Sequence, residues 1–395
     1  MGKPSRLLLV FLSLTVIPNA VLVILKTSNP QNIPRALSNV VEAGCDCRGS
    51  RVFAEAQELA AAPRPTVNYS QVASETPRRA NKTKYSRLGT QLQLDYAKMC
   101  PRGSLMLGQR SQFVPNHLDC PSLFIVGARK AGTSSLYMYV SRHPSFKGIL
   151  LDRGPKVGET YYFSSHWKSW KWSQYMKLFE HTSHYTTGES SVGYLTSCNV
   201  PERLWRSCGK QAKIVILLRD PIKRLESNYR MRIRLQLRGY SNNTKASTMV
   251  NLELERFINA ALKNGADIQS VEHSWEKFRC LFNPSSNMVF EGLYYVHIMN
   301  WLCNFPPENI LILNSEEFFH NTRGVFEEVI EFLGLPPLDR NTTAFITSTS
   351  YNTGRGGQGP RQQLSEMDRK KLRVLYKHTN QPLLNLLDWE GFVWS

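Results

Sequence analysis

The chain has 395 residues, of which 42% are hydrophobic, enough for one large globular domain or two ordinary ones, and this composition argues against wholesale disorder. Its 49 lysine and arginine residues outnumber its 31 acidic residues and give a formal net charge of +18. Such a field attracts polyanions, which leaves nucleic acid, acidic glycans and anionic membrane surfaces as partner classes.

The N-terminal part of the sequence contains a long apolar stretch. Residues 7–25 carry no charged side chain, and Lys3, Arg6 and Lys26 flank them. As a helix this stretch would span roughly 30 Å, close to the hydrocarbon thickness of a bilayer. A cleaved signal peptide is the alternative, but its apolar core is usually shorter. We therefore predict a transmembrane signal-anchor at 7–25, a cytosolic tail at 1–6, and a lumenal location for everything after the anchor.

Two further features suit a lumenal location. Sequons for N-glycosylation occur at Asn68, Asn81, Asn242 and Asn341. The eight cysteines show no Cys-x-x-Cys metal spacing. In an oxidising lumen the candidate local bridges are Cys198 with Cys208 and Cys280 with Cys303, although spacing alone does not fix the pairing. In a lumen, nucleic acid is an improbable partner and an acidic polysaccharide is the favoured one.

Residues 26–115 are rich in proline, alanine and basic polar residues and lack sustained periodicity, which predicts a stem with room for short helices at 51–62 and 89–99. The folded domain is expected at 116–395. Its predicted strands are 122–126, 213–218 and 310–313, with short extended pieces at 149–151 and 160–163. Its predicted helices run from the loop after the first strand to about 142, and over 221–237, 252–263, 294–305 and 325–333.

This alternation of apolar strands and helices predicts an α/β fold with a parallel sheet covered by helices on both faces. In such sheets, ligands bind beyond the carboxyl ends of the strands. An aromatic stretch at 167–179 is interpreted as packing over the domain rather than as a platform for stacking sugars.

A glycine-bounded loop follows the first predicted strand. Gly127 and Gly132 bracket it, Lys130 lies inside it, and Thr133 begins the helix. Backbone N–H groups and the positive end of a helix dipole would then point at one spot, which suits a phosphate or a sulfate. Nucleotide triphosphatases place their lysine directly after the second glycine, so this loop departs from that form. A turn without any ligand is the alternative.

A second candidate anion site follows the strand at 213–218. Arg219 stands at the strand end, where a guanidinium can form paired hydrogen bonds with a phosphate, and Ser227 lies about two helical turns further on. Arg219 could instead pair with a nearby carboxylate. Asp220 precedes Pro221 and is predicted to cap the helix rather than to hold a metal ion.

Four motifs, in this order, give the chain a specific resemblance. They are residues 127–136, residues 218–227, residues 292–302 with Phe305, Pro306 and 310–313, and the Gly-Arg loop at 353–357. In this set the domain resembles Golgi carbohydrate sulfotransferases that use 3′-phosphoadenosine 5′-phosphosulfate, in particular the heparan sulfate 3-O- and N-sulfotransferases and related chondroitin sulfotransferases. The resemblance implies a P-loop-like fold and a type II Golgi membrane protein whose acceptor is a glycosaminoglycan.

The resemblance also implies roles for individual residues. Lys130 would donate to the oxygen that bridges phosphate and sulfur. The loop residues Arg129, Ala131, Gly132, Thr133, Ser134 and Ser135 would hold the 5′-phosphosulfate. Arg219 and Ser227 would bind the 3′-phosphate. Residues Gly354, Arg355 and Gly356 would close over the nucleotide.

The resemblance assigns the catalytic base to Glu159, which would take the proton of the acceptor. Beside it, Gly158 stands where the family has lysine and Tyr161 where it has histidine, so these supporting positions depart from the pattern. Ser190 replaces a further family lysine, and the adjacent Glu189 is left without a role. The histidines His166, His181, His184, His273 and His297 show no ligand spacing, so no metal site is predicted.

Two other functions remain open at this point. A P-loop kinase or triphosphatase is one, and a lumenal glycan-binding protein that keeps the fold without the chemistry is the other. Basic residues at 230–238 could form a rim for a polyanion or a solvated helix face. The acceptor sugar, the position sulfated and the choice between a hydroxyl and an amine are not determined by the sequence.

Overall fold

The computed structural model describes residue 100 and residues 119–149, 158–179, 184–237, 239–241, 244–283, 286–349, 351, 364–387, 389 and 394. The chain divides into two compact units, Met1–Arg48 and Gly49–Ser395, and every described residue belongs to the second. The predicted anchor, the stem helices and the loop at 353–357 lie outside the described residues. Within those ranges, no helix is both long enough and apolar enough to cross a membrane.

Five parallel strands form one sheet in the order β2-β3-β1-β4-β5. The strands are β1 (Leu123–Gly127), β2 (Phe146–Gly148), β3 (Thr186–Glu189), β4 (Lys213–Leu218) and β5 (Ile310–Asn314). Every residue of β1 and β5 is buried, and only Lys213 of β4 is partly exposed. Continuous apolar strands of this kind are typical of parallel sheets that are covered on both faces. The predicted α/β class is confirmed.

The strand order creates a switch point between β1 and β4. The chain leaves β1 toward β2 on one side of the sheet and leaves β4 toward β5 on the other side. The loops after these neighbouring strands therefore diverge, and a crevice for a ligand forms where they part. Both predicted anion-binding segments follow these two strands.

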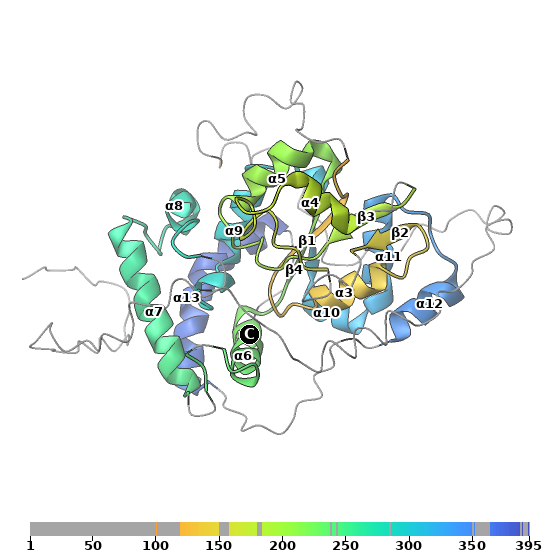
Figure 1. Ribbon diagram of the computed structural model, residues 1–395. Coiled ribbons are helices and arrows are strands. Elements are labelled where there is room, and N and C mark those ends of the chain that lie inside the picture. Colours follow the sequence, from red (N-terminus) through yellow and green to blue (C-terminus); the bar gives the residue numbers. More distant parts are fainter. Residues whose placement is uncertain are drawn as a thin grey trace, which may run out of the picture. The chain divides into compact units, whose positions relative to one another are not determined.

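Helices surround the sheet (Figure 1). They are α3 (Thr133–Val140), α4 (Trp172–Met176), α5 (Val200–Cys208), α6 (Pro221–Arg234), α7 (Ala246–Lys263), α8 (Val271–Phe278), α9 (Tyr294–Leu302), α10 (Ser315–His320), α11 (Thr322–Leu333), α12 (Arg340–Ser348) and α13 (Glu366–Leu387). Helix α3 packs against α11, and α9 packs against α8 and α13. All residues of α9 are buried, so this helix forms part of the core.

The three long apolar runs are confirmed as strands to within one residue at their ends. The four later helices are confirmed as α6, α7, α9 and α11 with shifted bounds; α7 begins six residues earlier than predicted. Gly334 ends α11 in the left-handed conformation, with φ of 71°. Strands β2 and β3 and helices α5, α10, α12 and α13 were not predicted, because their sequences are short or polar.

The predicted extended piece at 160–163 is wrong. The described backbone turns there, because the amides of Thr160 and Tyr161 donate to the hydroxyl of Ser191 instead of to a neighbouring strand. The aromatic stretch after it packs as expected. Tyr175 is fully buried, and its ring stacks on Tyr162 with a centroid distance of 4.4 Å.

The disulfides differ from the candidate local pairs. The structure joins Cys100 to Cys303, Cys120 to Cys208 and Cys198 to Cys280, with Cα–Cα distances of 5.4, 5.5 and 5.3 Å. A bridge between Cys198 and Cys208 is excluded because helix α5 separates these residues by about 13 Å along its axis. The three bridges instead join segments that are distant in sequence.

Candidate active site

The two anion-binding segments meet at the carboxyl ends of β1 and β4. Arg219 follows β4, and its Nη1 donates to the carbonyl oxygen of Lys130 at 2.9 Å. Just below this contact, the amide of Ala128 donates to the carbonyl of Leu217 at 2.7 Å. The two loops are therefore hydrogen-bonded to each other across the switch point, and Lys130 and Arg219 belong to one site.

The loop after β1 adopts a conformation that depends on glycine. Gly132 is the N-cap residue of α3 with φ of 98°, and a Cβ there would lie 3.0 Å from the ring of Phe319. The carbonyl of Ala131 accepts from the Ser315 hydroxyl at 2.8 Å. Because a trans peptide points its N–H away from its carbonyl, the amide of Gly132 is directed away from Ser315. Together with the start of α3, this orientation suits a bound anion.

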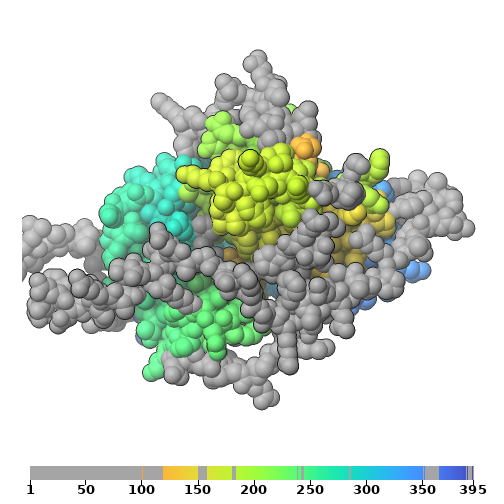
Figure 2. Space-filling model, in the orientation of Figure 1, coloured from red at the N-terminus to blue at the C-terminus, as the bar shows by residue number. Residues whose placement is uncertain are grey.

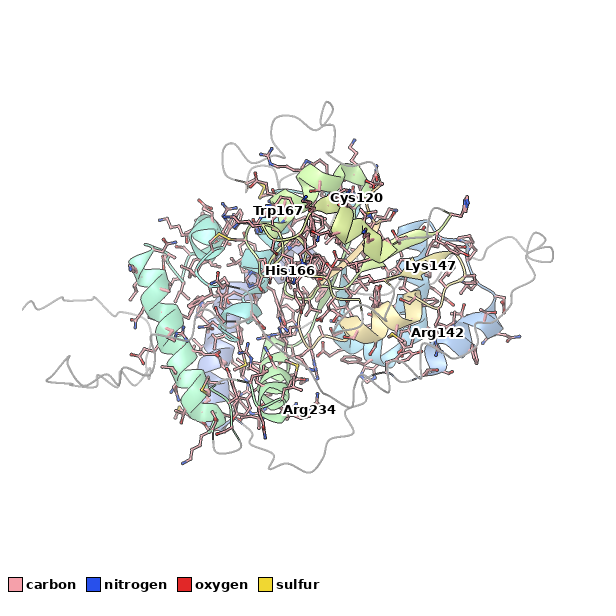
Figure 3. All side chains as sticks on the ribbon, in the orientation of Figure 1. Cys120, Arg142, Lys147, His166, Trp167 and Arg234 are labelled. Carbon is pink, nitrogen blue, oxygen red and sulfur yellow. A yellow bond between two sulfur atoms is a disulfide. The ribbon has the colours of Figure 1, made fainter. Side chains whose placement is uncertain are left out.

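Positive charge is concentrated around Lys130. Burial lowers the pKa of Lys130 to about 8. Four neighbouring guanidinium groups add to this shift, those of Arg234, Arg129, Arg219 and Arg230. Arg230 and Arg234 come from the last two turns of α6, so part of the basic run at 230–238 faces this site (Figure 3 labels Arg234). A cluster of like charges is stabilised when a multivalent anion binds to it.

The carboxylate of Glu316 interacts electrostatically with Arg219, whereas Asp220 has a different partner. Asp220 caps α6, because its Oδ1 accepts from the amides of Ile222 and Lys223 at 2.9 and 2.8 Å. The predicted capping role is confirmed. The Nε of Arg219 is buried and has no hydrogen-bond partner among the described residues. This guanidinium therefore keeps a donor that an anion could use. Ser227 is half-buried on α6.

A buried carboxylate connects the loop to α6. Glu291 accepts from Arg224 Nη1 at 2.8 Å and from Asn228 Nδ2 at 3.1 Å, and its other oxygen lies 3.7 Å from Nε of Arg129. Arg224 has no exposed surface. The distance between the two anion-binding segments is thus held by a buried ion-pair network. No spacing in the sequence indicates this role for Glu291.

Glu159 lies beside the same loop. The phenol of Tyr161 donates to its Oε2 at 2.7 Å, and Arg129 interacts electrostatically with both residues. Burial and then the charge of Glu159 raise the pKa of Tyr161, so the phenol stays protonated and remains a donor. Tyr161 therefore holds the Glu159 carboxylate near Arg129, the residue that precedes Lys130 in the loop.

Steric contact explains why glycine occupies the position before Glu159. Gly158 adopts φ of 75°, and a Cβ there would lie 2.5 Å from Cε1 of Tyr137. The Tyr137 ring is fixed, because its hydroxyl donates to the carbonyl of Gly188 and accepts from the amide of Ile149. A lysine cannot occupy this position without moving that ring. The departure at Gly158 is thus a feature of the packing of this chain.

Glu189 lies under the segment that carries Glu159. It is fully buried, and four hydroxyl groups donate to its carboxylate, those of Thr160 and Ser191 at 2.6 Å, Tyr175 at 2.7 Å and Tyr194 at 3.3 Å. Burial raises its pKa, and these hydrogen bonds oppose the rise. The sequence left the role of Glu189 undetermined. In the structure its hydrogen bonds to Thr160 and Ser191 hold the segment that carries Glu159.

The comparisons agree with this geometry. Residues 121–371 match the family model described as Sulfotransferase domain. The chain belongs to this family. Over 194 residues it is 30% identical to mouse carbohydrate sulfotransferase 15, covering 47% of this chain and 31% of that protein. Over 223 residues it is 27% identical to human bifunctional heparan sulfate N-deacetylase/N-sulfotransferase 3, covering 55% and 22%. The chain therefore spans about a third or less of the length of these relatives.

Two further similarities cover a larger share of the compared protein. The Dictyostelium discoideum membrane-associated sulfotransferase kil1 is 24% identical over 339 residues, covering 70% of this chain and 67% of that protein. A solved sulfotransferase from Alicyclobacillus acidocaldarius is 24% identical, with a TM-score of 0.48, and covers 69% of this chain and 97% of that one. The family model and the curated relatives confirm the predicted resemblance to carbohydrate sulfotransferases.

Tyr351, three residues before Gly354 of the predicted Gly-Arg loop, packs beside the helix that follows the phosphate-type loop. Gly354, Arg355 and Gly356 lie outside the described residues, but Tyr351 is described. The hydroxyl of Ser135 donates to the Tyr351 carbonyl at 3.1 Å, and the rings of Tyr351 and Tyr139 lie 5.2 Å apart. Tyr351 therefore lies next to α3.

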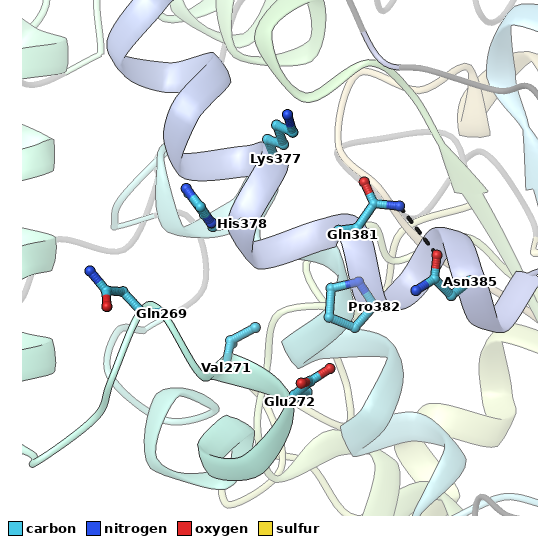
Figure 4. Close-up of a pocket in the computed structure, with 8 residues that line it drawn as sticks. All are labelled: Gln269, Val271, Glu272, Lys377, His378, Gln381, Pro382 and Asn385. Carbon is cyan, nitrogen blue, oxygen red and sulfur yellow. Dashed lines mark hydrogen bonds between the residues drawn. The ribbon is translucent and has the colours of Figure 1, made fainter. Parts of the chain in front are cut away.

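Other features lie away from the sulfotransferase site. A polar pocket between the start of α8 and the second half of α13 is lined by residues that include Glu272, Lys377, His378 and Gln381 (Figure 4). It contains none of the predicted site residues. Across the described ranges, no group of three or more histidine, cysteine, aspartate or glutamate side chains is placed to hold a metal ion.

Proposed function

We propose that this protein transfers the sulfuryl group of 3′-phosphoadenosine 5′-phosphosulfate to a hydroxyl or amine of a glycan, a glycosaminoglycan in particular. The observation that carries the proposal is the hydrogen bond from Arg219 to the carbonyl of Lys130, which unites the two anion-binding segments. A donor with one phosphate at each end of its ribose needs two positive sites at a fixed separation. Family membership supports the same chemistry.

The first chemical role is assigned to Glu159. The acceptor oxygen attacks sulfur in line, its bond to sulfur forms as the bond from sulfur to the bridging oxygen breaks, and its proton passes to the Glu159 carboxylate. Tyr161 donates to that carboxylate and orients it. Arg129 lies close enough to interact with both groups. These contacts support the assignment of Glu159 as a base next to the loop that would hold the donor.

The second role is stabilisation of the leaving group. Negative charge develops on the bridging oxygen and the 5′-phosphate, and Lys130 donates to that oxygen. The backbone of Ala131 and Gly132, with the hydroxyls of Ser134 and Ser135 and of Thr133 at the start of α3, surrounds the 5′-phosphate. The lowered pKa of Lys130 also means that a bound anion raises it again, so that the lysine is charged when the donor is present.

The 3′-phosphate is assigned to Arg219 and Ser227, and closure of the nucleotide side to Gly354, Arg355 and Gly356. The unpartnered Nε of Arg219 supports the first assignment. The contact of Tyr351 with Ser135 supports the second, because Tyr351 is only three residues before Gly354 in the sequence. The guanidinium can form paired hydrogen bonds with a phosphate, and this is the contact that would separate the donor from ordinary adenine nucleotides.

The acceptor and the cellular address are part of the same proposal. The net charge of +18 favours an acidic polymer, and relatives are named for carbohydrate and heparan sulfate sulfotransfer. Residues 7–25 would anchor the chain in the Golgi membrane in type II orientation, with 26–115 as stem and 116–395 as catalytic domain. N-glycans would be carried at Asn68, Asn81, Asn242 and Asn341. Three disulfides fit a lumenal compartment.

The test uses the secreted lumenal part and radiolabelled donor with desulfated heparan, chondroitin and dermatan chains as acceptors. Lys130→Ala and Glu159→Gln are expected to abolish incorporation. Lys263→Ala and Glu255→Gln, at exposed positions on α7, serve as matched controls with unchanged activity. Full activity in the first two variants would refute the mechanism.

The same assay separates the alternatives. Binding of adenosine 3′,5′-bisphosphate by calorimetry, with no transfer to any acceptor, would favour the glycan-binding protein without chemistry. Magnesium-dependent turnover of ATP would favour the kinase or triphosphatase. Against the latter stands Asp220, the acid nearest the end of β4, because its carboxylate is occupied in capping α6.

A further inference from the structure

Helix α13 carries an excess of positive charge. From residue 369 to its end the helix has no acidic residue. Its lysine and arginine residues in that part are Arg369, Lys370, Lys371, Arg373 and Lys377. Lys370, Arg373 and Lys377 are exposed, and their spacing of three and four residues places them on one face of the helix over roughly 10 Å. We call these three residues the basic row.

One acidic residue lies close to the basic row on the same helix. Glu366 pairs with Arg373, and both side chains are exposed. An exposed ion pair contributes little free energy, so an incoming anion can replace Glu366 at small cost. A helix face with charges of one sign over two turns suits an extended polyanion.

The polar pocket between α8 and α13 lies at the end of this row. Its lining includes Lys377, His378, Gln381 and Asn385 from α13 and Gln269 and Glu272 from the segment that leads into α8 (Figure 4). The pocket volume of about 230 Å³ is below the range of pockets for drug-sized ligands, so it suits a unit as small as one sugar ring. The amide of Gln381 donates to Oδ1 of Asn385 at 3.2 Å, which leaves the Asn385 amide group and the Gln381 carbonyl for a ligand.

Two polar groups at this pocket lack their usual partners. Pro382 lies inside α13 and has no N–H, so the carbonyl of His378 loses its helical donor. Below, Tyr295 is fully buried, and its hydroxyl has no hydrogen-bond partner within the part of the chain that the structure describes. This phenol interacts electrostatically with Glu272, a residue of the pocket lining. Buried polar groups are normally hydrogen-bonded, so these groups point to a ligand that supplies both donors and acceptors.

We propose that the basic row and the polar pocket form one binding track for a linear acidic glycan, separate from the donor site. This inference rests on the proposed function, because it assigns the track to the polymeric acceptor. The row pairs with carboxylates or sulfates along the polymer, and the pocket binds the hydroxyls of one sugar unit. The row alone would accept any polyanion. The pocket selects a glycan, because hydroxyl groups need neutral donors and acceptors together.

An ion pair connects this track to the helix that borders the candidate active site. Arg369 precedes the basic row, and its Nη2 lies 2.6 Å from Oε1 of Glu226 on α6. The last turns of α6 carry Arg230 and Arg234, which interact electrostatically with Lys130. A long polymer can therefore contact both regions at once. Anchoring on the track would raise the effective concentration of its sugars at the active site.

The first test measures binding of a long chondroitin chain and of polyglutamate at several salt concentrations. The row variant replaces Lys370, Arg373 and Lys377 by glutamine. It is expected to weaken both polymers about tenfold at 0.1 M salt and to reduce the slope of log affinity against log salt by about 2, since each charge contributes about 0.7.

The matched control removes three charges from other elements. It replaces Arg206, Lys210 and Lys263 by glutamine, and all three positions are exposed. Like the row, this set has one arginine in an exposed ion pair, because Arg206 lies 2.9 Å from Glu202. The control should bind both polymers within about twofold of the unaltered protein.

The second test separates a glycan from other polyanions. The pocket variant replaces Gln381 and Asn385 by alanine. It should weaken chondroitin about fivefold, the effect of one lost hydrogen bond, and should leave polyglutamate unchanged. Equal melting temperatures show that the variants are folded.

Each other outcome contradicts a defined statement. If the unaltered protein does not bind adenosine 3′,5′-bisphosphate, the proposed function fails, whatever the polymers do. If it binds this nucleotide but not chondroitin, or if the row variant binds chondroitin as well as the matched control does, only the track is overturned. If the pocket variant binds chondroitin normally, or loses chondroitin and polyglutamate alike, the surface does not select a glycan and the inference is wrong.

Discussion

Replacing Glu189 by alanine removes the common acceptor of four buried hydroxyl groups. The shortest of these hydrogen bonds are 2.6 Å, from Thr160 and Ser191, and the carboxylate has no exposed surface. A hydrogen bond to a charged group contributes about 1.5–3 kcal/mol, but neighbouring bonds in a network do not add fully. Each buried hydroxyl left without its acceptor costs about 1–3 kcal/mol, so with incomplete additivity we expect Glu189→Ala to lower the free energy of unfolding by about 4 kcal/mol.

That loss should lower the melting temperature by about 10 °C, because about 1 kcal/mol corresponds to roughly 2–4 °C in a domain of this size. Glu189→Gln keeps one acceptor oxygen and the volume of the side chain, so its loss should be about half as large, roughly 2 kcal/mol. Thermal and urea unfolding of the lumenal part give both values. Glu255→Ala, at an exposed position of α7, is the control and should stay within about 0.5 kcal/mol of the unaltered protein.

The same variant has a consequence for activity. The hydroxyl of Ser191 accepts hydrogen bonds from the amides of Thr160 and Tyr161 and donates one to Glu189. This network therefore fixes the backbone on the C-terminal side of Glu159. Glu189→Gln should therefore lower kcat while the affinity for adenosine 3′,5′-bisphosphate stays unchanged. If Glu189→Ala unfolds at the same midpoint as the control, the carboxylate does not hold this segment and the reasoning is refuted.

Three further predictions concern the same site and its frame. Burial and neighbouring arginines lower the pKa of Lys130 to about 8, so the ammonium loses its charge as the pH rises through 8. The affinity for adenosine 3′,5′-bisphosphate, measured by calorimetry, should therefore fall in this pH range, and Lys130→Arg should remove the fall. An affinity that does not change with pH in the unaltered protein would contradict this prediction. Tyr161→Phe removes the phenol that donates to Glu159 and orients it, so kcat should fall roughly tenfold in the transfer assay while the affinity for adenosine 3′,5′-bisphosphate stays unchanged. Replacing Cys120 and Cys208 by serine removes a bridge that closes a loop of 88 residues, and the expected loss of stability is about 4 kcal/mol by urea unfolding; an unchanged midpoint would argue against the bridge.

The strands were predictable where a buried apolar run stands alone. Residues 213–218 are such a run, and they form β4 with the predicted bounds. Strand β3 was missed because its sequence, Thr186–Glu189, is polar, although three of its four residues are buried. The burial of this strand depends on partners from other parts of the chain, such as the hydroxyl groups that donate hydrogen bonds to Glu189. A single sequence does not reveal such partners.

The candidate site shows the same division. The glycines around Lys130 and the proline after Asp220 are local signals, and they correctly indicated the loop and the helix cap. Glu291 and Phe319 gave no such signal, since their positions depend on how η6 (Phe290–Gly292) and α10 pack against distant loops. The candidate disulfide pairs were wrong for a related reason. Pairing cysteines that are close in sequence overlooks helix α5, which lies between Cys198 and Cys208.

Figure 2 shows that the segment carrying Glu159 (yellow-green) and helix α6 (green) reach the same face of the molecule. Arg234 and Arg230 influence Lys130 electrostatically from the end of this helix. Their contribution should be visible as a salt dependence of binding to an anionic polymer.

The central claim is that Lys130 and Arg219 hold opposite ends of one donor, and binding of two nucleotides tests it most directly. Adenosine 3′,5′-bisphosphate and adenosine 5′-monophosphate differ only in the 3′-phosphate. We predict that Arg219→Ala lowers the affinity for the first to that for the second, by about 10- to 100-fold, and leaves the second unchanged. Lys130→Ala should weaken both nucleotides alike. Equal loss of both nucleotides in Arg219→Ala, or no preference for the 3′-phosphate in the unaltered protein, would contradict the account.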